Sequence, residues 1–220
     1  MMTRGLNSIY LQAPHIKPED EKAFCKYVLC WHLFLDLHHS SEEADFFPMI
    51  EQMAGETGIM AANVEQHYAF DDGLEKFGAY FRDVQAGKEK YDGKKVGALI
   101  NSFGEILTQH LHSEIPTLVS LKRFGPEKMN GLPALQERVA QHAVKRLGVA
   151  GIVWCYANVN RTADEGIFSW WPPAPAPFTL AMTAIFWYLN QDVTKFGSAD
   201  RHGNPRELYA VLKDEPEKAL

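Results

Sequence analysis

Apolar residues that recur every three to four positions are the feature that most constrains how this chain folds. A short stripe of this kind covers residues 3–12, and longer ones run from Pro18 to Gly55, from Ile59 to Gly87 and from Gly93 to Leu118. This spacing is typical of helices with one buried face. Short glycine-containing connections between such helices predict antiparallel neighbours, so we predict an all-α helical bundle.

The character of the sequence changes after Gly125-Pro126. We expect a fifth helix over 132–147, an extended stretch over 168–178, where consecutive prolines forbid helix, and a final amphipathic helix over 179–195. The predicted division is a four-helix bundle at 1–124 and, at 125–220, a helical and extended C-terminal segment that packs on the bundle.

Composition and charge exclude several classes of partner. The net charge is -6, and no basic run or Gly-rich phosphate loop offsets it, which argues against nucleic acid and against an acidic membrane surface. The apolar stretches are too short to span a bilayer, and the N-terminus lacks the apolar core of a secretory signal. We therefore expect a cytoplasmic protein with no membrane, whose three cysteines are buried free thiols.

Two His-x-x-x-Glu pairs carry the chemistry. His38 with Glu42, and His110 with Glu114, each lie one helical turn apart on the same face. Both pairs fall in phase with the apolar stripes, and so does His67. Polar residues in this phase must be buried in the core or interrupt it.

A metal ion would explain this burial. An unpaired ionised carboxylate costs several kcal/mol or more in an apolar core, and two adjacent carboxylates repel each other. A cation removes both costs, and imidazole with carboxylate, without cysteine, suits iron, manganese or zinc. The predicted metal ligands are His38, Glu42, His67, His110 and Glu114.

The same helix offers a second register. His39 and Glu43 form another pair rotated by one residue, and the stripe through Trp31 and Leu35 favours His38 with Glu42. We assign His39 and Glu43 to the flank as partners of the ligands. The remaining histidines have no partner at ligand spacing, and we expect His112 to be exposed.

At these residues the sequence resembles the hemerythrin-like, HHE cation-binding superfamily. The motifs are HHSSEEADFFP (38–48), VEQHYAFDDGLEKF (64–77) and QHLHSEIPTL (109–118). The segments RGLNSIYLQAPHI, WPPAPAP and DRHGNPRELYA are similar to fungal members, which extends the resemblance over most of the chain.

The resemblance implies a four-helix bundle that holds a pair of irons. Glu42 and Glu114 would bridge the metals, with His38, His67 and His110 as terminal ligands. Two positions depart from the family pattern: no histidine precedes His15, which lies between two prolines, and Asp71 stands where many members have a second histidine on the third helix. These departures leave a di-iron, a mononuclear and a metal-free bundle as alternatives.

Two functions follow from these alternatives. The first is a non-haem iron protein that binds or activates O2 or reactive oxygen species, as a carrier or as an oxidoreductase acting on a small hydrophobic molecule. The second is a metal-poor biosynthetic enzyme or binding protein in which Glu42, His67, His110 and Glu114 act as acids and bases. The aromatic residues of the C-terminal segment either cover a pocket in the second case or simply cover an apolar face.

Overall fold

The computed structural model describes residues 1–167 and 169–211. Within these ranges the chain is helical, and the only strand-like pairing is an isolated bridge between Ala199 and Pro205. The larger helices are α1 (Met2–Gln12), α2 (Glu21–Ser41), α3 (Phe47–Ala54), α4 (Ala61–Gln85), α5 (Gly93–Asn101), α6 (Gly104–Ser120) and α7 (Leu132–Asn158). Short helices follow: α8 (Ala176–Ala181), α9 (Trp187–Leu189) and α10 (Gln191–Thr194). Two π-helical turns, Glu42–Phe46 and Met182–Phe186, join α2 to α3 and α8 to α9.

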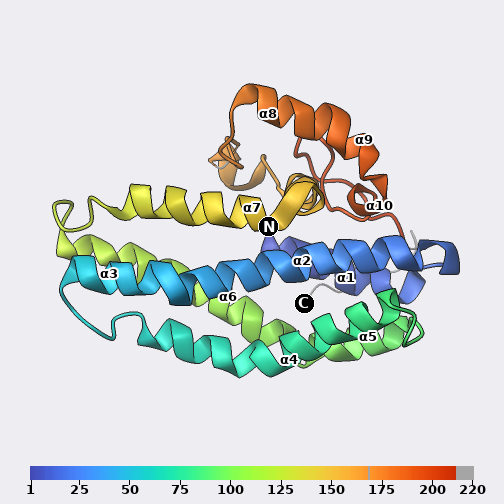
Figure 1. The fold of residues 1–220 in the computed structure, drawn as a ribbon, viewed down its shortest axis with the longest axis horizontal. Coiled ribbons are helices and arrows are strands. Elements are labelled where there is room, and N and C mark those ends of the chain that lie inside the picture. The colour runs from blue at the N-terminus through green and yellow to red at the C-terminus, as the bar shows by residue number, and fades with distance from the viewer. Residues whose placement is uncertain (168, 212–220) are drawn as a thin grey trace.

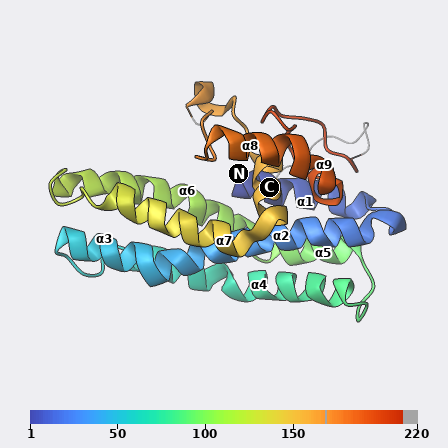
Figure 2. The same cartoon turned by 45° about the horizontal axis from the view of Figure 1, so that its top comes forward.

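Four long rods form an antiparallel bundle (Figures 1 and 2). They are α2 with α3, then α4, then α5 with α6, and finally α7, with α2 packed between α4 and α7. The short α1 lies at one end of the bundle, and α8 to α10 form a layer over α7 and α2 (Figure 1). The all-α helical bundle predicted from the periodicity is therefore observed.

Local sequence signals explain where the rods begin and end. Gly55 ends α3 with a left-handed backbone (φ 74°), which glycine adopts without steric cost. The Asp92 side chain begins α5 by accepting hydrogen bonds from the backbone amides of Lys94 and Lys95. The chain therefore reverses direction at short connections, as the sequence predicted.

The π-helical turn at Glu42–Phe46 changes the phase of the apolar stripe. The apolar stripe of the sequence predicts that Phe46 and Met49 face the core, but Phe47 and Ile50 are buried there, and Phe46 and Met49 are only half-buried. A π turn holds one residue more than an α turn, so every later side chain is rotated. Pro48 follows directly, and because it has no N–H it loses no hydrogen bond at this irregular point.

Two predicted helices have different limits in the structure. The fourth is divided at Ser102–Phe103 into α5 and α6. The fifth continues to Asn158, and its helical geometry is interrupted only at Gly148 (φ 61°, ψ -177°). The predicted final helix 179–195 comprises parts of α8, the second π turn, α9 and α10.

Residues from both sides of position 124 share one core. The main cluster joins residues of α1, α2, α4, α5 and α6 with Leu147, Trp154 and Cys155 of α7 and with Val193 and Phe196. The three cysteines are free and buried, as predicted. The division of the chain at 124/125 stays a prediction, but the structure shows that α7 provides the fourth rod of the bundle. No helix in the described ranges combines the length and apolar character needed to cross a membrane.

Candidate metal centre

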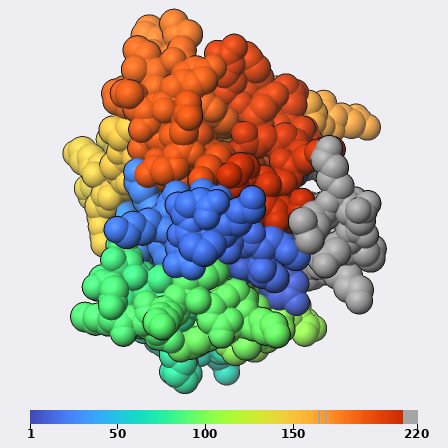
Figure 3. All heavy atoms as spheres, turned by 90° about the vertical axis from the view of Figure 1, so that its right-hand side faces the viewer, coloured from blue at the N-terminus to red at the C-terminus, as the bar shows by residue number. Residues whose placement is uncertain are grey.

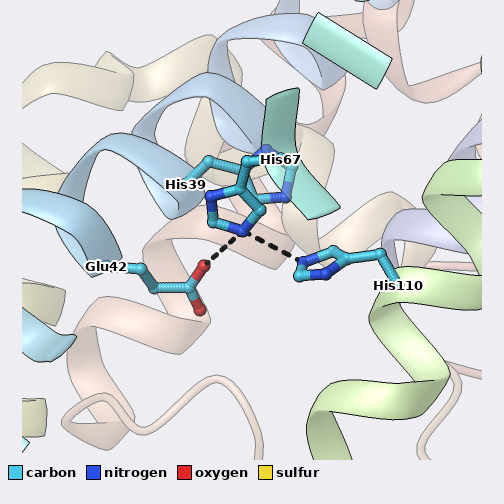
Figure 4. A group of neighbouring side chains, drawn as sticks. All are labelled: His39, Glu42, His67 and His110. Carbon is cyan, nitrogen blue, oxygen red and sulfur yellow. Dashed lines mark hydrogen bonds and ion pairs between the residues drawn. The ribbon is translucent and has the colours of Figure 1, made fainter. Parts of the chain in front are cut away.

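Histidine and glutamate side chains converge inside the bundle, between the main core and a second apolar cluster around Phe47 and Ile50. They come from the end of α2, the π turn, α4 and α6 (Figure 4). The apolar walls are close, because the His39 ring lies 5.0 Å from Phe70 and the His67 ring 6.0 Å from Phe47, measured between centroids. The polar cluster is therefore enclosed by aromatic side chains.

The polar atoms form two groups that share Glu42. The first group contains His39, Glu42, His67 and His110, and the second contains His38, Glu42 and Glu114. Within each group, one nitrogen or oxygen atom per residue lies within 4.8 Å of the others. All four members of the first group are buried, whereas the His38 side chain in the second group is 28% exposed. The second group is therefore the one nearer to solvent.

Hydrogen bonds fix the orientation of two imidazoles. His67 Nδ1 lies 2.6 Å from a Glu43 carboxylate oxygen, and His110 Nδ1 lies 3.0 Å from the side-chain oxygen of Gln66. Both partners accept, so in each neutral ring Nδ1 carries the proton and Nε2 does not. The two Nε2 atoms face each other across 3.1 Å (Figure 4). Two lone pairs at this distance repel unless a proton or a metal cation lies between them.

Buried polar atoms without partners support the same conclusion. Among the described residues, His38 Nε2, both ring nitrogens of His39, Glu42 Oε2 and Glu114 Oε1 are buried and accept or donate no hydrogen bond. Leaving such groups unpaired costs about 1–3 kcal/mol each. A bound cation would satisfy His38 Nε2, one ring nitrogen of His39 and the two carboxylate oxygens, so these residues fit a metal.

The electrostatics put the imidazoles in the form that metals need. Burial lowers the pKa of His38 and of His110 to about 4, and that of His39 to about 2, so these rings are neutral at pH 7. Burial, and then the neighbouring Glu114, raise the pKa of Glu42 well above its usual range, and burial also raises that of Glu114. The metal-free pair therefore holds a proton that a cation would replace.

The structure brings the five sequence-predicted residues together. His38, Glu42, His67, His110 and Glu114 all belong to one of the two groups, and their role as ligands stays a prediction. Glu43 lies where the sequence placed it, as a partner of a candidate ligand. Asp71 and His112 are exposed, and neither these two nor His15 belongs to either group.

The residue that the sequence argument placed on the flank is His39. In the structure it is 6% exposed and belongs to the first group. The burial of His39 could have been predicted from the sequence of α2, which is apolar on almost every side. Such a helix buries more than one stripe of residues.

The fold and the site together define a class of protein, a helical bundle with a buried His/Glu cation site. Residues 29–120 match the family model described as the Hemerythrin HHE cation binding domain. This range includes every residue of the two groups, and it contains the motifs on which the resemblance to this family rests. The chain is also 29% identical, over 223 residues, to the Dimeric xanthone biosynthesis cluster protein R11 of the fungus Cryptosporiopsis sp. (strain 8999). That alignment covers 99% of this chain and 82% of the relative. No solved structure matches the chain.

Proposed function

We propose that this chain is a non-haem iron protein with a dinuclear centre that binds or activates O2 or reactive oxygen species and acts on a small hydrophobic molecule. The observation that carries the proposal is the pair of buried donor groups that share Glu42. A helical bundle with paired histidines and carboxylates is a known setting for two irons, and manganese or zinc would fit the same donors. The relative's name refers to a biosynthesis cluster, which supports a small organic molecule as substrate.

Three imidazoles and one carboxylate would hold one metal: His39, His67, His110 and Glu42. His38, Glu42 and Glu114 would hold the other. Bound iron would supply the redox chemistry, since its two common oxidation states allow electron exchange with O2 or peroxide.

The chain's own residues orient the imidazoles, exclude water and hold a proton. Glu43 and Gln66 hold the Nδ1 protons of His67 and His110, which aims each Nε2 inward. Phe47 and Phe70 exclude water from the first group. Glu42 and Glu114 hold a proton in the metal-free protein and give it up when a cation arrives.

Metal content and the optical spectrum of the purified protein test this proposal. We expect about two irons per chain and an absorption band in the near ultraviolet. Glu42→Ala and Glu114→Ala are each expected to lower the iron content and weaken that band. The matched control is Glu105→Ala, because Glu105 is exposed on the same helix as Glu114.

The same measurement tests whether His39, the histidine of the second register, helps to bind the metal. His39→Ala should lower the metal content, whereas His112→Ala, an exposed position on α6, should leave it unchanged. A folded wild-type protein that takes up no iron, manganese or zinc would contradict the proposal and favour the acid–base alternative.

A further inference from the structure

The segment from α8 to α9 presents an uncharged apolar surface to solvent. Residues 166–191 contain no Asp, Glu, Lys or Arg, although such residues make up 23% of the chain. The exposed side chains of this surface, here called the α8–α9 surface, are Trp170 (59%), Phe178 (36%), Leu180 (65%), Ile185 (56%), Tyr188 (52%) and Leu189 (71%). Figure 3 shows the segment as the upper layer of the molecule, above the N-terminal helices.

The opposite side of the same segment is already used. Met182 and Trp187 are buried against Val153 and Tyr156 of α7. Met182 and Trp187 are five residues apart, and the π turn between them brings both to the inner face. Leu180 and Ile185, also five apart, consequently share the outer face. The segment is therefore apolar on both faces, and a helix that is hydrophobic all round is normally buried.

The exposed residues form one surface large enough to bind a partner. Trp170 and Leu180 line the same shallow depression beside α8, which joins the preceding loop to the helix. A whole large side chain has a surface of roughly 150–250 Å². With the exposed fractions given above, the six residues together expose on the order of 600 Å² to solvent. One partner in a standard protein interface contributes about 800 Å², and its centre is rich in aromatic residues and poor in charge.

Charge decides which occupant fits this surface. The whole chain carries a net charge of -6, so two copies repel each other over most of their surfaces. Two copies would meet at the α8–α9 surface with few charges opposed, because the segment itself carries none and Arg161, beside the depression, lies over the Tyr156 ring. Helices that lie on membranes carry Lys and Arg beside their apolar face, and this segment has none.

We propose that the α8–α9 surface is the interface of a symmetric homodimer. A symmetric contact uses the same patch on both copies, and a neutral apolar patch is complementary to itself. The interface lies on the layer over α7, outside the His/Glu cluster, so the proposal does not depend on metal binding.

The mass of the full chain in solution tests the proposal. We would measure this mass by light scattering and sedimentation at about 1–100 µM, a range that includes the dissociation constants of weak interfaces of this size. The expected mass is twice the chain mass of 24.9 kDa. Leu180→Glu combined with Leu189→Glu should give a monomer with an unchanged circular dichroism spectrum. The control, Ile106→Glu combined with Val119→Glu, alters two exposed apolar positions on α6 and should stay dimeric.

Two further measurements keep the proposal open to refutation if the variants fold poorly. Hydrogen exchange of wild-type amides in 176–189 should slow as the protein concentration rises. Neutral phosphatidylcholine vesicles should not bind the protein in a flotation assay. A wild type that is monomeric over the whole range, or a monomer that floats with the vesicles, would overturn the proposed dimer. A double variant that folds and stays dimeric would place the interface elsewhere.

Discussion

Replacing Trp154 with alanine tests whether α7 unfolds together with the helices that carry the metal centre. Trp154 is fully buried on α7, and its ring centroid lies 5.6 Å from that of Phe34 and 6.2 Å from that of Tyr27, both on α2. It also fills the space above Gly5 of α1, where an added Cβ would lie 2.6 Å from the Trp154 ring. Deleting a buried tryptophan side chain costs about 3–5 kcal/mol, because the transfer free energy is lost and a cavity remains.

Urea unfolding followed by circular dichroism measures this cost. With an m-value of about 2–3 kcal/mol per molar, the midpoint should fall by about 1–2 M in one cooperative transition. The control is Val144→Ala, on the same helix but 47% exposed, which should change the free energy of unfolding by less than about 0.5 kcal/mol. Two separate transitions, of which Trp154→Ala shifts only one, would refute a shared core and support an independent C-terminal domain.

Three further predictions concern the start of α2, the break in α7 and the metal centre. Asp20→Asn should cost about 1–3 kcal/mol at pH 7, because the hydrogen bond from Lys195 lowers the pKa of Asp20. Because the pKa of Asp20 is lower in the folded state, this stabilisation is fully present above 3.8 and should shrink as the pH falls through the lowered value; in urea titrations, a difference from wild type that does not depend on pH would contradict this. Gly148→Ala should lower thermal stability by about 1–3 kcal/mol, since its φ of 61° with a ψ of -177° suits only glycine; an unchanged melting temperature would count against that strain. Glu43→Ala should weaken metal binding about 10–100-fold in chelator competition, because His67 loses the partner that orients it, and an unaltered affinity would exclude this role.

The fold could be predicted from the sequence because a helix with one buried face has apolar residues at regular intervals. In α4 the periodic stripe is buried at His67, Phe70, Leu74, Phe77 and Phe81 and half-buried at Val64, since the helix is regular over its whole length. The buried positions are predicted wrongly where the helix is irregular. The π turn rotated the stripe after Glu42. The helix predicted over 132–147 stops one residue before Gly148, whereas α7 continues past this glycine to Asn158.

The candidate site could be predicted only in part, for a similar reason. The two His-x-x-x-Glu pairs and the in-phase His67 located five residues. However, only one buried stripe was expected on each helix. α2 lies between α4 and α7, so residues about 100° apart around its axis are both enclosed. His38 and His39 therefore each enter a donor group, and only the packing of three helices reveals it.

The π-helical turn at Glu42–Phe46 also limits how this chain can change in length. Removing Ala44 from it would restore a regular helix and keep every charged side chain and every candidate ligand in the sequence. The same deletion would turn α3 by about 100° and withdraw Phe47 and Ile50 from the second apolar cluster. At Ala44, which is exposed and belongs to neither donor group, a substitution should be tolerated more readily than the loss of the residue, because the number of residues in the turn sets how α3 joins the metal centre to its surrounding core.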